Sequence, residues 1–265
     1  MTTHFPDYYK DFKCIASRCK HTCCAGWEID VDEASLKRFM AVPGIARHIK
    51  DGSIVLGENE RCPFLREDGL CTMILEHGKD FLCDICTEHP RFYNDFEDHT
   101  EGGLGLACEE ACRLILEKKE DFKLCPPLEL PEEIQTVFDT TRALTDRLHE
   151  LKENIIPSLT RASFINTLEV MDPVWTEAMD RIIANPPSLE EENAAIDADS
   201  RKFSNFCAYL LYRYPCAAGF AAEATYLLAD LVLRGTDMLE AARLFSGEIE
   251  YSDINIEKAI EEFSF

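Results

Sequence analysis

Four cysteines stand within eleven residues near the start of the chain, in the segment CIASRCKHTCC that runs from Cys14 to Cys24. The whole chain has 265 residues and 13 cysteines. Thiolates are soft ligands, and four of them at this density suit zinc or an iron–sulfur cluster far better than packing in a hydrophobic core. The sequence therefore predicts a metal centre, and the spacing alone does not choose between the two metals.

Acidic residues outnumber basic residues by 50 to 27, which gives a formal net charge of −23. Such a surface repels the phosphates of nucleic acids and of anionic membranes, so neither is expected as a partner. No run approaches the roughly 20 apolar residues of a membrane-spanning helix. The opening segment MTTHFPDYYKDFK also lacks the apolar core of a signal peptide. We therefore expect a cytoplasmic protein, in which thiols stay reduced and disulfides do not explain the cysteines.

The composition divides the chain into two parts. Eleven of the 13 cysteines lie in residues 1–125, which are rich in loops, whereas residues 126–265 have the pattern of helices. Pro126 and Pro127 mark the boundary, because a proline restricts its own backbone and that of the preceding residue. We expect a mainly α fold in which a Cys-rich, loop-rich metal-binding domain (1–125) packs on an α-helical domain (126–265).

Apolar periodicity and capping residues predict the positions of the helices. In the second part the expected helices cover residues 131–155, 173–184, 190–214, 217–233, 237–245 and 254–263. In the first part they begin at Asp32 and at Cys108, and Ser53–Leu56 is a candidate strand. The glycine-rich segment EGGLG at 101–105 lacks a convincing preceding strand, so it is predicted to be a turn and not a nucleotide-binding loop.

Further cysteine motifs follow the first one. They are CPFLREDGLC with Cys62 and Cys71, CDICTEHPR with Cys83, Cys86 and His89, and ACEEAC with Cys108 and Cys112. The CxxC of Cys83 and Cys86 has no surrounding βαβ pattern, so a role as ligand or in packing is preferred over a redox role. His21 and His89 are alternative zinc ligands or ordinary hydrogen-bonded histidines. Cys207 and Cys216 are expected to be core residues, and Cys112 and Cys125 are ligands or core residues.

The order of these motifs resembles the flagellin lysine-N-methylase family, within the wider group of proteins with zinc- or iron-chelating cysteine clusters. The motifs are FKCIASRCKHTCCAGWEIDVD, CPFLREDGLCTM, the cysteine followed by HPR, and LACEEACRLIL. The resemblance covers roughly residues 7–118. The segment FCAYLLYRY at 206–214 is weakly similar. The family's cysteine positions correspond to Cys14, Cys19, Cys23, Cys24, Cys62, Cys71, Cys86 and Cys108. Cys83 and Cys112 stand where the family often has Ser and Ala.

The resemblance implies an enzyme that transfers a methyl group from S-adenosylmethionine to lysines of flagellin and carries a [4Fe–4S] cluster. It implies that the eight matching cysteines are the metal ligands.

The chain departs from the family in two places. Members of the family are commonly longer in the C-terminal half, and CEEACR replaces their usual CPEAAR. The resemblance therefore supports membership of the family more strongly than it supports flagellin as the substrate.

The site for S-adenosylmethionine is expected between the two parts of the chain, because ligand sites favour such junctions. Candidate wall residues are Trp27, Asp30, Arg91 and Tyr93. The other interpretation of these residues is structural, since aromatic side chains are more often in the core and an arginine often only pairs with a carboxylate.

A second hypothesis from another class is a non-catalytic zinc- or iron-binding module that docks a protein partner through its helical half. The short C-terminal half favours it. The acidic surface is compatible with a lysine-rich partner, and it is equally compatible with solubility alone.

Overall fold

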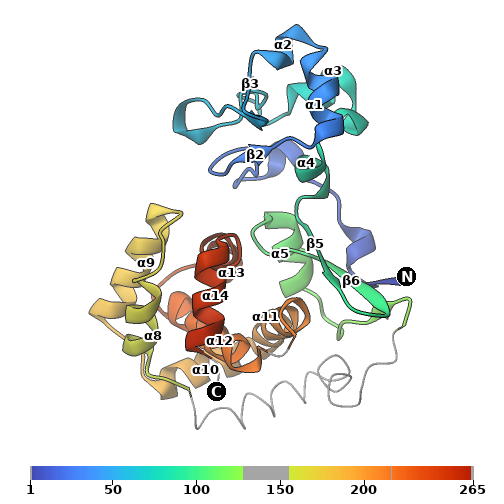
Figure 1. Ribbon diagram of the computed structural model, residues 1–265. Coiled ribbons are helices and arrows are strands. Elements are labelled where there is room, and N and C mark those ends of the chain that lie inside the picture. Colours follow the sequence, from blue (N-terminus) through green and yellow to red (C-terminus); the bar gives the residue numbers. More distant parts are fainter. Residues whose placement is uncertain (1, 128–154, 216, 264–265) are drawn as a thin grey trace. The chain divides into compact units, whose positions relative to one another are not determined.

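The computed structural model describes residues 2–127, 155–215 and 217–263, which form twelve α-helices and seven short strands (Figure 1). The mainly α fold is thus confirmed. The chain divides into two compact units, of which residues 13–92 form one and residues 1–12 with 93–265 form the other. We call them the Cys-rich unit and the helical unit. The helix predicted over 131–155 lies almost wholly outside the described residues.

The Cys-rich unit has few regular elements, as expected. They are β2 (Ile29–Asp30), α1 (Glu33–Met40), α2 (Pro43–Ala46), β3 (Ile49–Lys50), β4 (Ser53–Ile54), α3 (Thr72–His77) and α4 (Asp84–Glu88). Strand β4 pairs antiparallel with both β2 and β3, which confirms the predicted strand at Ser53. Helix α1 begins where predicted, because the Asp32 carboxylate accepts a hydrogen bond of 2.8 Å from the Ser35 N–H.

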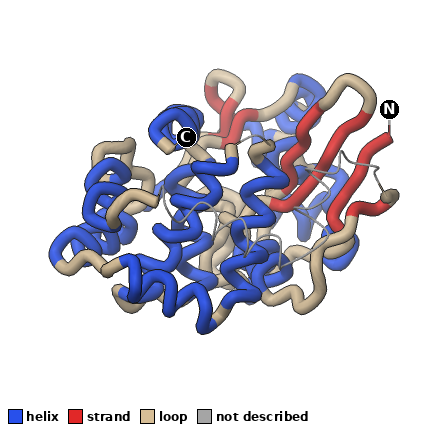
Figure 2. The backbone as a smooth tube through the Cα atoms, turned by 90° about the horizontal axis from the view of Figure 1, so that it is seen from below, coloured by secondary structure: helices blue, strands red, loops and turns tan. Residues whose placement is uncertain are grey.

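The start of the chain belongs to the helical unit. Strand β1 (Thr2–Pro6) lies between β6 (His99–Leu104) and β7 (Leu124–Cys125), parallel to the first and antiparallel to the second, and β5 (Arg91–Asp95) completes the sheet (Figure 2). The predicted boundary at residue 125 therefore lies inside the helical unit. Hydropathy patterns indicate only local structure, so they could not predict this pairing, which joins segments almost a hundred residues apart in the sequence.

The glycine-rich segment at 101–105 was predicted to be a turn, and this prediction is wrong. Glu101 to Leu104 are part of β6, in which His4 of β1 is the partner of Glu101. Gly102 has a packing role, because a Cβ atom there would lie 2.4 Å from a ring carbon of Phe5 and 3.2 Å from one of Tyr93. Only glycine allows these rings to cover the strand so closely.

Helices make up most of the helical unit. They are α5 (Glu109–Leu116), α8 (Ser158–Ile165), α9 (Pro173–Ala184), α10 (Leu189–Ala198), α11 (Ser200–Arg213), α12 (Ala218–Leu233), α13 (Met238–Phe245) and α14 (Asp253–Glu262). Helix α12 is buried along nearly its whole length and contacts α8, α9, α10, α11, α13 and α14. None of the described helices combines the length and hydropathy needed to cross a lipid bilayer.

The predicted helix boundaries hold at most positions in this unit. Asp172 caps α9 by accepting from the Val174 N–H at 2.9 Å, with Pro173 in the first turn. The helix predicted over 190–214 is two helices, because Asp199 leaves helical geometry between α10 and α11. A π-helix over Ser246–Glu250, which the sequence analysis does not predict, follows α13 directly.

Candidate metal centre

Backbone pairing in the Cys-rich unit brings distant cysteines together. The Cys62 N–H donates to the Cys24 carbonyl at 2.8 Å, beside a bridge between Ala25 and Arg61. Cys71 forms a second bridge with Leu65. The Asp84 N–H donates to Asp32 Oδ2 at 3.0 Å, which ties the residue after Cys83 to the start of α1. These contacts carry the cysteines of three separate motifs toward one place.

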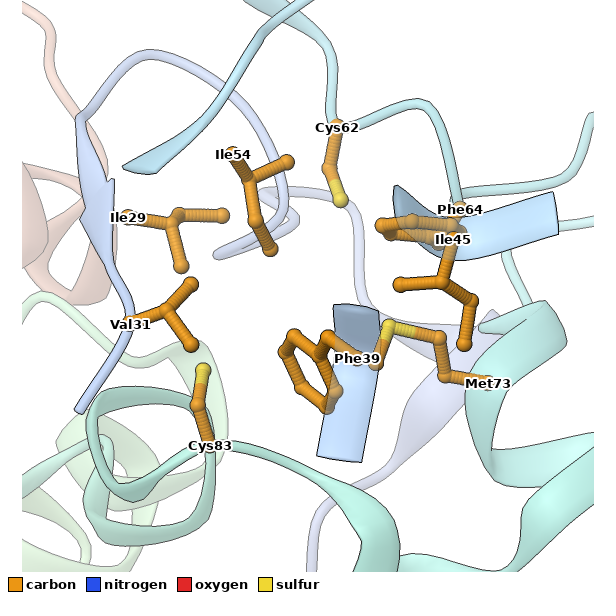
Figure 3. Close-up of a cluster of buried hydrophobic side chains, with 9 residues drawn as sticks. All are labelled: Ile29, Val31, Phe39, Ile45, Ile54, Cys62, Phe64, Met73 and Cys83. Carbon is orange, nitrogen blue, oxygen red and sulfur yellow. The ribbon is translucent and has the colours of Figure 1, made fainter. Parts of the chain in front are cut away.

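Five cysteines line a single buried cluster of side chains. Cys62 and Cys83 are members of the cluster, with 8% and 1% exposure, and Figure 3 shows their sulfur atoms pointing into it. Cys24, Cys71 and Cys86 pack against it. The other members are Ile29, Val31, Phe39, Ile45, Ile54, Phe64 and Met73. Four of these five cysteines are predicted ligands, and the fifth, Cys83, is one that the family resemblance sets aside.

The thiols in this cluster influence one another's protonation. A hydrogen bond from the Cys23 thiol, with further help from Thr22 and Arg61, lowers the pKa of Cys24 to about 6. A hydrogen bond with Cys86 lowers the pKa of Cys83 to about 7, while burial raises the pKa of Cys62 to about 11. Cys24 is therefore largely a thiolate at neutral pH, which is the form that binds metals.

The cysteines converge without forming a finished ligand set. Among the residues that the structure describes, no group of three or more Cys, His, Asp or Glu side chains lies close enough together to hold a metal ion. His89 is held mainly neutral, because burial lowers its pKa to about 4. The centroid of the His89 ring lies 5.5 Å from the centroid of the Trp27 ring.

The remaining predicted ligands lie elsewhere. Cys14 is exposed and its sulfur accepts from the Ala16 N–H at 3.4 Å, while the Cys19 thiol donates to the His21 carbonyl at 3.1 Å. Cys23 is exposed beside Cys24. Cys108 belongs to the helical unit, where it precedes α5.

The cysteines with alternative core roles divide clearly. Cys112 is 1% exposed and its thiol donates to the Leu239 carbonyl at 3.4 Å, so its place is in the core of the helical unit. Cys207 is buried in α11, as predicted. Cys125 is exposed at the end of β7. Cys216 lies outside the described residues.

The residues predicted for the cofactor wall are divided between the units. Trp27, Asp30 and Arg91 lie in the Cys-rich unit, and Tyr93 is in the helical unit, where it is 47% exposed. The Trp27 indole donates to the Cys23 carbonyl, and Asp30 accepts from the Ser53 hydroxyl at 2.6 Å. Arg91 donates to the Thr87 carbonyl at 3.1 Å, at the end of α4.

The helical unit contains a polar network that the sequence analysis missed. The Tyr209 hydroxyl donates to Glu250, with its oxygen 2.9 Å and 3.1 Å from the two carboxylate oxygens, and accepts from Arg213 at 2.7 Å. Tyr209 is fully buried, and Glu250 ends the π-helix. Tyr209 and Arg213 lie in the weakly similar segment FCAYLLYRY, which is the one sequence signal that points to this place.

Comparison with known proteins gives relatives over part of the chain. It is 30% identical over 139 residues to the lysine-N-methylase of Salmonella choleraesuis and 28% identical over 139 residues to that of Salmonella typhimurium. It is 28% identical over 139 residues to the flagellar biosynthetic protein FliU of Salmonella muenchen. No family model and no solved structure matches the chain.

The coverage of these matches is unequal. Each covers 47% of this chain, but the matched part is 35% of either lysine-N-methylase and 82% of the FliU protein. The chain thus matches about a third of the length of the named methylases. Over nearly half of its own length the chain is similar to the lysine-N-methylases, as the order of its cysteine motifs predicts.

Proposed function

We propose that this chain is an S-adenosylmethionine-dependent protein lysine N-methyltransferase of the flagellin type, in which cysteines of the Cys-rich unit hold a [4Fe–4S] cluster. The observation that carries the proposal is the set of ordered cysteine motifs, which agrees with the similarity to proteins named lysine-N-methylase and to a flagellar biosynthetic protein. The expected cytoplasmic location would keep the thiols reduced.

The donor chemistry of the Cys-rich unit suits such a centre. Cys24, Cys62, Cys71 and Cys86 surround one buried core, and soft thiolates are the ligands of iron–sulfur clusters and of structural zinc. In this proposal these four hold the metal, and Cys83 lies among them. Cys14, Cys19 and Cys23 are alternative ligands within the same unit, and Cys108, in the helical unit, is the remaining ligand position that the family resemblance implies. A bound centre would order a unit that has little regular structure of its own.

The proposed cofactor site uses the predicted wall residues of the Cys-rich unit, which are Trp27, Asp30 and Arg91. When bound, S-adenosylmethionine supplies a sulfonium methyl group that a neutral lysine amine can displace. The Trp27 ring can stack on a cation or on a nucleobase. The Asp30 carboxylate can accept hydrogen bonds from hydroxyl or ammonium groups, and the Arg91 guanidinium can pair with a carboxylate. Tyr93 belongs to the helical unit, and its place in the cofactor site stays a prediction.

The proposed substrate is a lysine-bearing protein. The net charge of −23 attracts a lysine-rich surface at long range and speeds its encounter with the enzyme. This attraction weakens as salt screens the charges. Neither nucleic acid nor membrane has a part in the proposal.

The test is methyl transfer by the full chain. Protein purified without oxygen and loaded with iron and sulfide is titrated with S-adenosylmethionine in a calorimeter, then incubated with flagellin and S-adenosylmethionine carrying a labelled methyl group. The Salmonella typhimurium lysine-N-methylase is the positive control. We expect cofactor binding and labelled methyl-lysine. Loaded protein that binds no S-adenosylmethionine and labels no flagellin refutes the proposal.

The second candidate is a zinc- or iron-binding module that docks a protein partner through its helical unit. The fact that favours it is the length of the match, because 35% of a methylase need not retain the activity of the whole. In this case the metal is bound and S-adenosylmethionine is not. The same calorimetric titration therefore separates the two candidates.

A further inference from the structure

One arginine in the helical unit is surrounded by three carboxylates. The Arg161 side chain, on α8, has no exposed surface. Its guanidinium contacts Glu192 of α10, lies 3.2 Å from Glu223 Oε2 and lies 3.4 Å from Asp230 Oδ2, both on α12. The three carboxylates are between 0% and 2% exposed. This cluster joins the three helices.

The charges in this cluster do not balance when all its groups are ionised. One guanidinium faces three carboxylates, so two negative charges would stand without compensation in the interior. A buried, uncompensated carboxylate is strongly disfavoured, and binding a proton is the usual remedy. The Tyr226 ring also faces the cluster, with its centroid 5.7 Å from Arg161 Cζ. The remaining described charges around the cluster are Asp197, near Tyr226, and Arg234, near Asp230. Arg234 donates to the Asn185 carbonyl and adds one cation at the end of α12.

The hydrogen bonds place one missing proton. Glu223 Oε1 accepts from the Ile156 N–H at 2.8 Å. Both oxygens of Asp230 are buried, and its carboxylate lies within hydrogen-bonding reach of the Ser158 hydroxyl. The carboxyl of Glu192 is within hydrogen-bonding reach of Asp230. A proton on one of these two groups turns a repulsive contact into a hydrogen bond.

We propose that the Arg161 cluster is a proton-dependent lock, in which Glu192 and Asp230 share a proton and Glu223 can hold another, so that α8 stays fixed to α10 and α12 until these protons are lost as the pH rises. The lock is a property of the fold of the helical unit and does not depend on metal or on methyl transfer.

The protonation equilibria agree with this geometry. Burial raises the pKa of Glu192 to about 8 and that of Glu223 to about 7, and it raises the pKa of Asp230. A carboxyl with a raised pKa in the folded state binds a proton more tightly there than in the unfolded chain. The contribution of such a carboxyl to the free energy of folding is complete below its pKa in the unfolded chain, about 4.3. This contribution declines as the pH rises further, until the pH passes the pKa of the carboxyl in the folded state.

The test is the pH dependence of unfolding of the full chain, in the wild type and in Glu192→Gln. Glutamine mimics the protonated acid but cannot lose a proton. Between about pH 5.5 and pH 7.5 the wild-type unfolding constant should rise about tenfold more per pH unit than that of Glu192→Gln. The control Glu190→Gln removes an exposed carboxylate of the same helix and should leave the wild-type slope unchanged.

Equal slopes in the wild type and Glu192→Gln overturn the proposal. A second measurement needs no variant and covers the case in which Glu192→Gln does not fold. The infrared spectrum of the folded wild type at pH 6 should contain the carbonyl band of a protonated carboxyl, and this band should disappear on titration to pH 9.5. A spectrum without this band at pH 6 also overturns the proposal.

Discussion

Replacement of Gly102 by alanine tests the pairing of β1 with β6, which assigns the first residues of the chain to the helical unit. The new Cβ atom would stand 2.4 Å and 2.9 Å from two ring carbons of Phe5. Carbon atoms in contact normally lie about 3.5–4.0 Å apart. The Phe5 ring or the strand must therefore move by about 1 Å.

The cost follows from two opposing effects. Overpacking of this kind destabilises a protein by about 1–3 kcal/mol. Alanine also loses less backbone freedom on folding than glycine, and this difference raises the free energy of unfolding by about 0.5–1 kcal/mol. The net expectation is a loss of about 0–2.5 kcal/mol for Gly102→Ala. Gly247→Ala is the control, because a Cβ atom there has nothing within 4 Å and its backbone is not left-handed.

Denaturant unfolding followed by circular dichroism measures both variants. A second comparison uses Phe5→Ala, since removing the ring should abolish most of the cost of Gly102→Ala if the two side chains meet. A cost of Gly102→Ala that is unchanged by Phe5→Ala, or equal to that of Gly247→Ala, would refute the strand pairing described above.

Two further substitutions test contacts within the helical unit. Asn205→Ala removes an amide that donates to the carbonyls of Leu116 and Lys118 at 3.1 Å and 2.8 Å, so it should cost about 1–3 kcal/mol in denaturant unfolding. Tyr209→Phe leaves Glu250 without its phenol donor and should cost about 1.5–3 kcal/mol, measured in the same way. A cost below about 0.5 kcal/mol would contradict the contact in either case.

Most helices of the helical unit could be predicted from the sequence because their signals are local, although α8 was not predicted. Asp172 followed by Pro173 predicts the start of α9, and Asn185 followed by two prolines predicts its end. The division between α10 and α11 was missed, because the apolar stripe continues across Asp199 while its backbone leaves the helix. The π-helix after α13 likewise has no recognised local signal.

Apart from β4 at Ser53, the strands could not be predicted, and neither could the polar clusters, because both depend on contacts between distant segments. Thr2–Pro6 has no alternating pattern, and it becomes a strand only through pairing with β6 and β7. Arg161 stands more than thirty residues before the first of its carboxylate partners. The cysteine spacing does predict that thiols gather, and the backbone pairing of Cys24 with Cys62 decides which motifs meet.

The central claim is that the gathered cysteines hold a metal centre, and metal analysis of Cys62→Ser tests it most directly. The matched control is Cys207→Ser, which changes a buried cysteine of the helical unit. Iron, sulfide and zinc are measured, with an absorption spectrum, after anaerobic purification and cluster reconstitution. We predict iron and sulfide in equal amounts in the wild type and Cys207→Ser, and their loss in Cys62→Ser. Undiminished metal in Cys62→Ser, or a wild type that holds no metal after reconstitution, would contradict the account.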